Sequence, residues 1–421
     1  MIKTILYFRI LMFIMMVTTY LPLIYNRLPD YVGSHHFWTI LWGVSLLFLK
    51  PKVFIQKLML LVLMYGLFLF IMIRFFWTDM NEWNVKALWV EFYQIAVGCS
   101  IITYFHVSKD YVSLAKLTRW VLIFIAITSV LTIFFYTQIV ETTERLGWEE
   151  WNEGSKKYGY ATYGMAIVLM SVMGVLIYLF KNKILNFKYL WLFFLFIVAI
   201  ALIRIQLFTN IMLAAFLVIL SMVSAKNRKT TFVIISIIGL IIILIPQAFY
   251  INILYKLSVV FADFKEISFK LKETAIYLEF GEYVDRNAIA GRAERYTWLL
   301  RTFPEHPFMG CFYMQKSPTY NEACVHLHWM NKLVVTGILG IVFFVPIFIQ
   351  FLKQQLRIIK GNYQFYFILS IISILLYGVF KTIAGREAWY MFFVIIPGMY
   401  YLPLLNKKNN LNENEEGIIH H

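Results

Sequence analysis

The sequence predicts an all-α protein that crosses a membrane many times, and three observations predict it. The first is composition, since 61% of the 421 residues are hydrophobic and only 14% are charged, whereas a soluble domain is about half apolar and about a quarter charged. The second is the presence of long uncharged runs, such as Ile205–Ala225 and Phe232–Pro246, that approach the roughly 20 residues a helix needs to cross a bilayer. The third is that these runs do not alternate with period two, as barrel strands would, so helices are expected to satisfy the backbone in lipid.

The apolar runs follow one another along nearly the whole chain, and we expect about twelve transmembrane helices. In chain order the expected spans are Ile5–Tyr25, Phe37–Leu49, Phe54–Trp77, Val85–Phe105, Trp120–Gln138, Tyr160–Phe180, Tyr189–Ile205, Phe208–Ala225, Thr231–Tyr250, Trp329–Phe351, Phe365–Phe380 and Trp389–Leu405. They divide the chain into an N-terminal transmembrane region (1–250, about nine spans), a large extracytoplasmic loop (251–328), a C-terminal transmembrane region (329–405, about three spans) and a polar cytoplasmic tail (406–421).

The formal charge of +15 does not indicate a nucleic-acid-binding protein, because the positive residues do not form one patch. They recur in short groups in every second connection, which is the pattern of the positive-inside rule. These groups are Lys50, Lys52 and Lys57; Lys109, Lys116 and Arg119; Lys181, Lys183 and Lys188; Lys226, Arg228 and Lys229; and Lys353, Arg357 and Lys360. The rule places these connections and both termini in the cytoplasm, and residues 251–328 outside.

The long outer connection has structure of its own. A loop of this length in a compact protein is usually functional. Between Lys256 and Phe280, apolar residues at near-helical spacing alternate with lysines and glutamates, which predicts a helix lying in the membrane interface. Residues Arg292–Phe303 predict a second short helix, which Pro304 and Pro307 would end.

Arg204 lies close to the outer end of the seventh expected span, within the apolar sequence Leu202-Ile203-Arg204-Ile205. Ionisable residues at membrane depth are costly and are candidates for function. Two interpretations stay open. Arg204 is either an arginine at a helix end that extends to the interface, or an anchor for phosphate, which a guanidinium grips through two parallel hydrogen bonds.

The long outer loop and the span after it hold the densest group of motifs. In order they read Gly291-Arg292-Ala293-Glu294-Arg295-Tyr296, Pro307-Phe308-Met309-Gly310, His326-Leu327-His328 and Gly337-Ile338-Leu339-Gly340. This order of Gly-Arg, aromatic, Pro-x-x-Gly, His and Gly-Ile-Leu-Gly resembles the O-antigen polymerase and O-antigen ligase superfamily, which includes the Wzy-type polysaccharide polymerases. Arg204 resembles an arginine at the same relative place, although Ile203 and Ile205 stand where the family usually has a small polar residue and a glycine.

The resemblance implies an inverting, metal-independent glycosyltransferase of the GT-C kind, with no cofactor, in the bacterial cytoplasmic membrane with its active face outside. Donor and acceptor would be glycans linked to undecaprenyl pyrophosphate, and membrane lipids and a chain-length regulator protein are candidate partners. His326 matches the family's histidine by its distance from Gly337 and would take the proton of the attacking sugar hydroxyl. Arg204 and Arg292 would hold the pyrophosphate. Secondary candidates are Arg295, His328, Lys381 and Arg386.

Two other functions stay open from the sequence. An O-antigen ligase moves a finished glycan to a different acceptor, and the residues do not separate it from a polymerase. A lipid-linked-glycan flippase or transporter should place ionisable residues along a path through the membrane. The expected spans are nearly uncharged at mid-depth apart from Glu91, which favours the enzyme.

The other reactive side chains give weaker signals. Cys311 and Cys324 both fall in the outer loop, where an oxidising compartment allows a disulfide, and two free thiols are the alternative. His326, His328 and Glu322 have a spacing that is weak evidence for a metal site, so no metal is expected. Lys381 and Arg386 are suited to phosphate binding and equally to anchoring at the interface.

Overall fold

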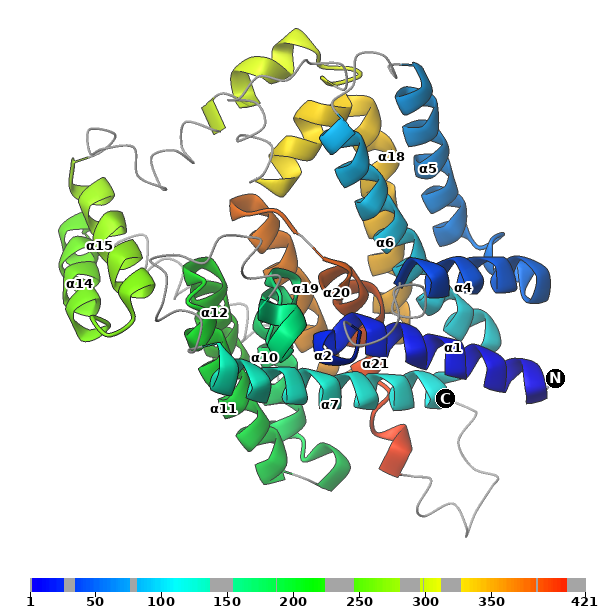
Figure 1. The fold of residues 1–421 in the computed structure, drawn as a ribbon, viewed down its shortest axis with the longest axis horizontal. Coiled ribbons are helices and arrows are strands. Elements are labelled where there is room, and N and C mark those ends of the chain that lie inside the picture. The colour runs from blue at the N-terminus through cyan, green and yellow to red at the C-terminus, as the bar shows by residue number, and fades with distance from the viewer. Residues whose placement is uncertain are drawn as a thin grey trace.

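The computed structural model of the chain describes residues 2–25, 35–75, 82–136, 154–186, 188–223, 246–280, 296–297, 299–311, 327–383 and 385–406. Within these ranges the protein is helical and has no strand, as the sequence predicts (Figure 1).

The helices run in this order: α1 (Ile2–Tyr20), α2 (Pro22–Tyr25), α4 (His35–Leu49), η1 (Pro51–Val53), α5 (Lys57–Phe75), α6 (Glu82–Ser108), α7 (Tyr111–Phe135), α10 (Tyr163–Lys181), η2 (Ile184–Asn186), α11 (Lys188–Ile205), α12 (Phe208–Val223), α14 (Gln247–Val260), α15 (Lys265–Phe280), η4 (Phe303–Glu305), α18 (His328–Ile358), α19 (Tyr363–Phe380), α20 (Arg386–Tyr390), the π turn η5 (Met391–Ile395) and α21 (Ile396–Met399).

Seven of the described helices are long and apolar enough to cross a membrane, namely α5, α6 from Ala87 onward, α7, α10, α11, α18 and α19. Three shorter apolar helices, in α1, α4 and α12, accompany them, and these ten helices coincide with ten of the expected spans. The ninth expected span, Thr231–Tyr250, lies mostly outside the described residues. The twelfth, Trp389–Leu405, is a helix that the π turn η5 interrupts.

The outward faces of these helices are apolar. Leu67 and Phe70 on α5, Phe193 and Phe196 on α11 and Val342 on α18 each expose more than half of their surface. A helix at the surface of a soluble protein is polar on its outer face, and a large exposed apolar surface marks contact with a partner or with lipid. Together with their length, these faces make the chain a helical membrane protein.

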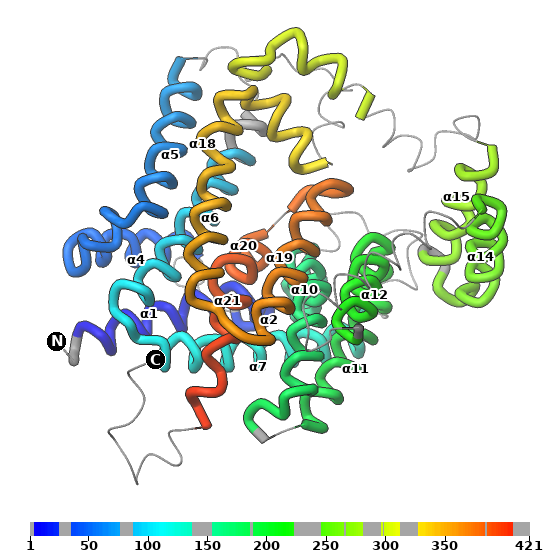
Figure 2. Tube along the Cα trace, turned by 180° about the vertical axis from the view of Figure 1, so that it is seen from behind, coloured from blue at the N-terminus to red at the C-terminus, as the bar shows by residue number. Residues whose placement is uncertain are grey.

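α10 lies at the centre of one group of helices. It packs against α11, α12 and α19, and every residue from Gly164 to Ile177 is buried, as expected for a helix that is apolar on all sides. α5, α6 and α18 form a second group and stand side by side in both views (Figures 1 and 2). The buried C-terminal helix α20 contacts both α6 and α10, and η5 contacts α6, so α20 joins the two groups.

α7 begins at Tyr111 rather than at Trp120, because Asp110 caps the helix by accepting a hydrogen bond from the Ser113 backbone N–H at 3.2 Å. Lys116 and Arg119, expected in a loop, are therefore exposed residues of the first turns of α7. Their long side chains can extend from a helix end to the membrane surface.

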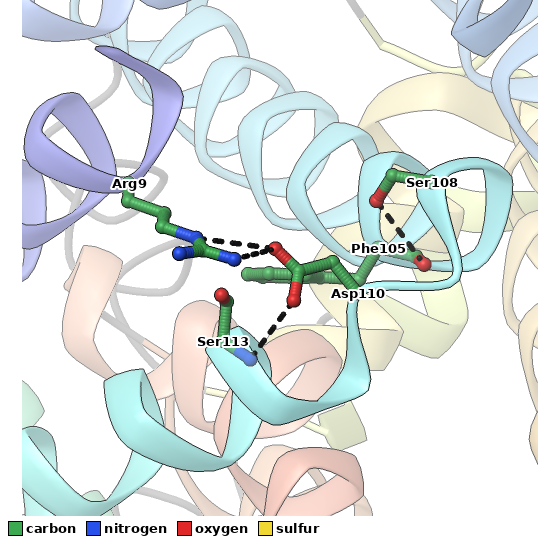
Figure 3. Close-up of polar contacts among 5 residues, drawn as sticks. All are labelled: Arg9, Phe105, Ser108, Asp110 and Ser113. Atoms are coloured by element: carbon green, nitrogen blue, oxygen red, sulfur yellow. Dashed lines mark hydrogen bonds and ion pairs between the residues drawn. The ribbon is translucent and has the colours of Figure 1, made fainter. Parts of the chain in front are cut away.

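The same carboxylate fixes α1 to the start of α7. Arg9 donates to Asp110 Oδ2 through Nε at 3.2 Å and through Nη2 at 2.9 Å (Figure 3). Partial burial raises the pKa of Asp110, but the hydrogen bonds from Arg9 and from Ser113 outweigh burial and hold the pKa below its usual value.

The segment from Lys256 to Phe280 is not one interfacial helix, as the sequence predicted, but the end of α14, a turn and α15. The two helices pack against one another, and Ser268 Oγ donates to the Ser258 carbonyl oxygen at 2.7 Å. Ile267 and Leu271 are buried, so these two apolar residues of the segment pack within the protein. In both views the α14–α15 hairpin lies at the edge of the molecule beyond α12, which α15 contacts (Figures 1 and 2).

Candidate functional site

α18 is broken at Gly337, where the backbone adopts φ 66° and ψ −172°. This region of φ and ψ is open almost only to glycine. A break within a transmembrane helix leaves backbone groups without their helical partners, and such groups must be satisfied inside the protein. The sequence predicted a continuous span here.

The loop segment Pro307–Cys311 supplies the missing partners. The N–H of Ile338 donates to the Pro307 carbonyl oxygen at 2.9 Å, and that of Leu339 donates to the Phe308 carbonyl oxygen at 3.1 Å. In return, the N–H of Cys311 donates to the Val334 carbonyl oxygen at 3.0 Å. The loop therefore crosses the break in α18 as a backbone-bonded bridge.

Glycine is required on both sides of this bridge. Gly310 has φ 71°, and a Cβ atom there would overlap the backbone of Val335 and Gly337. A Cβ atom at Gly337 would overlap the backbone of Phe308 and Gly310. The Pro-x-x-Gly motif and the Gly-Ile-Leu-Gly motif are thus two halves of one docking contact.

The segment His328–Thr336, which precedes the break, carries a buried charged cluster. Glu91 of α6 forms an ion pair with Lys332, and Glu91 Oε1 lies 3.2 Å from His328 Nε2. His328 and Lys332 are four residues apart and so share one face of α18. The side chains of Glu91, His328 and Lys332 are only 13%, 5% and 3% exposed, so solvent screens their charges little.

Lys332 compensates the charge of the Glu91 carboxylate, since an unpaired charge away from water is costly. The His328 imidazole contacts the other oxygen of the same carboxylate. The imidazole packs edge-on against Trp329, with ring centroids 4.6 Å apart, and lies 5.8 Å from the Trp389 ring.

Arg204 is half-buried in the last turn of α11. The helix ends at Gln206, which adopts a left-handed backbone conformation with φ 57°. Ile205, which stands where the resembled family usually has glycine, is still helical. Tyr136 at the end of α7 donates to the Ile205 carbonyl oxygen at 3.4 Å, so Arg204 lies where α7 ends. No carboxylate among the described residues forms an ion pair with Arg204.

Lys381 and Arg386 flank the turn between α19 and α20, and both make contacts that hold this turn. Lys381 Nζ lies 5.8 Å from the ring centroid of Tyr163, at the start of α10. Arg386 Nη2 donates to the Thr18 carbonyl oxygen of α1 at 2.8 Å. Between them, Gly385 has φ 90° and is the N-cap of α20. Glu387 of α20 accepts a hydrogen bond from Thr162 Oγ1 at 3.1 Å.

These residues share one end of the bundle, which we call the motif end. Trp329 Nε1 donates to the Leu375 carbonyl oxygen near the end of α19 at 2.7 Å, and Tyr296 donates to the Val379 carbonyl oxygen. The Tyr136 and Tyr160 rings, 5.3 Å apart, connect the end of α7 with the start of α10. The motif end thus comprises the ends of α7, α11 and α19 and the starts of α10, α18 and α20.

Several residues singled out by the sequence lie outside the described residues: Arg292, Arg295, His326, Glu322 and Cys324. The roles of these residues and the expectation that no metal is bound therefore stay predictions, and the disulfide and the two free thiols stay alternatives. Cys311 is buried, with Sγ 3.3 Å from the Val334 carbonyl oxygen.

Sequence reasoning missed the pairing of Glu91 with Lys332. The available signal was their opposite charge inside two apolar spans, because ionisable groups in a membrane usually pair with one another. Their separation of 241 residues gave no indication that α6 and α18 are neighbours.

Comparison of the chain with protein-family models, with curated proteins and with solved structures found no match.

Proposed function

We propose that this chain is a membrane glycosyltransferase that polymerises undecaprenyl-pyrophosphate-linked oligosaccharide repeat units into O-antigen or another surface polysaccharide. The observation that carries the proposal is the docking of Pro307–Gly310 on the break at Gly337. The two motifs are separate in the sequence but form one unit in space. Contact between the two motifs is expected if they belong to one site. Two motifs that matched the family only by chance would have no reason to lie together.

In this proposal the acceptor's sugar hydroxyl attacks the anomeric carbon of the donor. The bond from that carbon to the pyrophosphate oxygen breaks, and the configuration inverts. His326 takes the hydroxyl proton, since an imidazole accepts protons near neutral pH. Arg204 and Arg292 hold the pyrophosphate and stabilise the negative charge that grows on it as it leaves.

The charge distribution supports placing the motif end outside the cytoplasm. The positive-inside rule counts the basic residues of the connections, and the connection beyond the opposite end of α10 carries Lys181, Lys183 and Lys188. Arg204, Lys381 and Arg386 at the motif end are candidates to hold a negatively charged lipid headgroup. By the positive-inside rule we propose that both termini are cytoplasmic. With the ninth and twelfth expected spans, which the ten apolar helices do not cover, the chain would have about twelve transmembrane helices. We propose that they form an architecture like that of GT-C glycosyltransferases.

The glycan profile of a deletion strain of the native host tests this function. Loss of a polymerase should leave surface glycan of one repeat unit, and a plasmid-borne wild-type copy should restore long chains. Unattached long chains would identify a ligase instead. Accumulation of lipid-linked repeat units on the cytoplasmic leaflet would identify a flippase, and both of these outcomes contradict the proposal.

A further inference from the structure

α14 has one face that packs against α15 and another, apolar face that stays exposed. On the packed face Ser258 is buried, and its carbonyl oxygen accepts the hydrogen bond from Ser268 of α15. The exposed face carries four apolar side chains, each with more than a third of its surface accessible: Phe249, Ile253, Leu257 and Val260. We call these four residues the α14 stripe.

The spacing of the α14 stripe makes it one continuous surface. Steps of four, four and three residues keep its members on one side of a helix, over about 16 Å of the helix length. The stripe holds no polar side chain. The exposed surface of α15 differs, because it carries Lys272 and Glu279 beside Phe269 and Phe280.

The residue types of the α14 stripe and its surroundings favour lipid as the partner. The centres of protein interfaces are enriched in Trp, Tyr and Arg, and the stripe has none of them. The neighbouring helix α12 exposes Met212, Phe216 and Ile219, a surface of the same kind that faces lipid. α15 contacts α12, and the hairpin lies beside α12 in both views (Figures 1 and 2). The hairpin thus stands where the lipid-facing surface of the bundle continues.

The place of α14 in the chain also favours contact with the membrane. The helix begins directly after Pro246, and the preceding sequence Phe232–Pro246 carries no charge and belongs to the ninth expected span. A helix that follows such a span starts at the membrane surface. Lys256 is exposed beside the stripe, so its ammonium can reach lipid phosphates while its stem covers apolar surface.

We propose that the α14 stripe binds the lipid bilayer. α14 lies on the extracytoplasmic leaflet, with the four apolar side chains among the acyl chains and Lys256 at the headgroups, as in other interfacial helices. α15 covers the other side of α14 and faces water. The choice of leaflet rests on the proposed orientation of the chain, whereas the contact with lipid does not depend on the transfer reaction.

Nitroxide collision rates test this contact in the full chain, reconstituted into nanodiscs of phosphatidylethanolamine and phosphatidylglycerol. In a variant without native cysteines, one nitroxide at a time is attached at Phe249, Ile253 or Val260 of the stripe, or at the exposed control positions Asn252 and Lys272. Oxygen concentrates among acyl chains, and a nickel chelate stays in water. Relative to the controls, the stripe positions should collide severalfold more with oxygen and severalfold less with the chelate.

Two results would overturn the proposal. Collisions with the chelate as frequent at the stripe as at the controls would mean that the stripe faces water. Rare collisions with both reagents at the stripe would mean that protein covers it.

A pair of matched variants tests the same contact without a label. Ile253→Asp should speed amide hydrogen exchange of residues 247–280 in nanodiscs severalfold, because a carboxylate among acyl chains is costly. Asn252→Asp places the same charge one residue away, off the stripe, and should leave exchange unchanged. Both substitutions replace exposed side chains, so both variants should fold. Equal exchange in the two variants would also overturn the proposal.

Discussion

At the scale of single residues, the pair of Glu91 and Lys332 has the largest expected effect on stability. Removing one partner of a buried ion pair costs about 3–5 kcal/mol, whereas replacing both partners by apolar side chains is often neutral. Lys332→Met should therefore lower the free energy of unfolding by about 3–5 kcal/mol, and adding Glu91→Met should recover most of that loss. Denaturant unfolding in lipid or detergent measures both. Equal losses in the single and double variants would mean that the two charges do not depend on one another.

Substitutions of Arg204 test whether this side chain binds the phosphate of the donor. Arg204→Ala should raise the donor KM and lower kcat, together by about ten- to a hundredfold in kcat/KM, the loss expected for a hydrogen bond to a charged group. Arg204→Lys should recover only part, because an ammonium cannot form the bidentate fork. Steady-state kinetics with lipid-linked donor measures these effects. Full activity of the lysine variant would favour the interpretation of Arg204 as an interfacial arginine.

A residue of the site could be predicted from the sequence only where its immediate neighbours in the chain mark it as unusual. Arg204 was recognisable because one charge interrupts an apolar run. The contact of Glu91 with His328 was not recognisable, since helix packing and not sequence spacing brings α6 to α18. His328 was predicted only as a secondary candidate beside His326, whereas the structure shows its buried side chain next to the Glu91 carboxylate.

At the scale of elements, glycine explains the break in α18. Gly337→Ala should lower the free energy of unfolding by at least about 1–3 kcal/mol, the cost of a side chain in this backbone region, and should loosen the docked loop. Thermal unfolding and proteolysis of residues 303–311 measure both effects. The control is Gly43→Ala in α4, where a Cβ atom meets nothing within 4 Å and alanine favours the helix. Wild-type stability of Gly337→Ala would contradict the docked bridge.

The helices themselves were largely predictable, because hydrocarbon thickness sets the length of an apolar run. Their ends and interruptions were not. The cap formed by Asp110 moves the start of α7 back past two charged residues, Lys116 and Arg119. A turn at Phe261–Phe264 divides the predicted amphipathic segment into α14 and α15. In both places a local hydrogen bond or mutual packing overrides the pattern of hydrophobicity.

At the scale of the whole molecule, the account requires a defined orientation in the membrane. In a variant without native cysteines, a cysteine at Glu305 of the exposed η4 segment should react with a membrane-impermeant thiol reagent in intact cells. A cysteine at the exposed Lys183, between α10 and α11, should react only after the membrane is opened. The reverse pattern would place Arg204 and the docked loop in the cytoplasm and would exclude the proposed reaction site.

Chain formation by the purified protein tests the central claim most directly. Wild-type protein in lipid, given purified undecaprenyl-pyrophosphate-linked repeat units and a chelator, should make glycans longer than one unit. His326→Ala should leave donor binding nearly intact and reduce chain formation by roughly 10²–10⁴-fold, as expected for a lost base, and Arg292→Ala should impair both donor binding and turnover. Absence of chains with the wild type, or full activity of His326→Ala, would contradict the account.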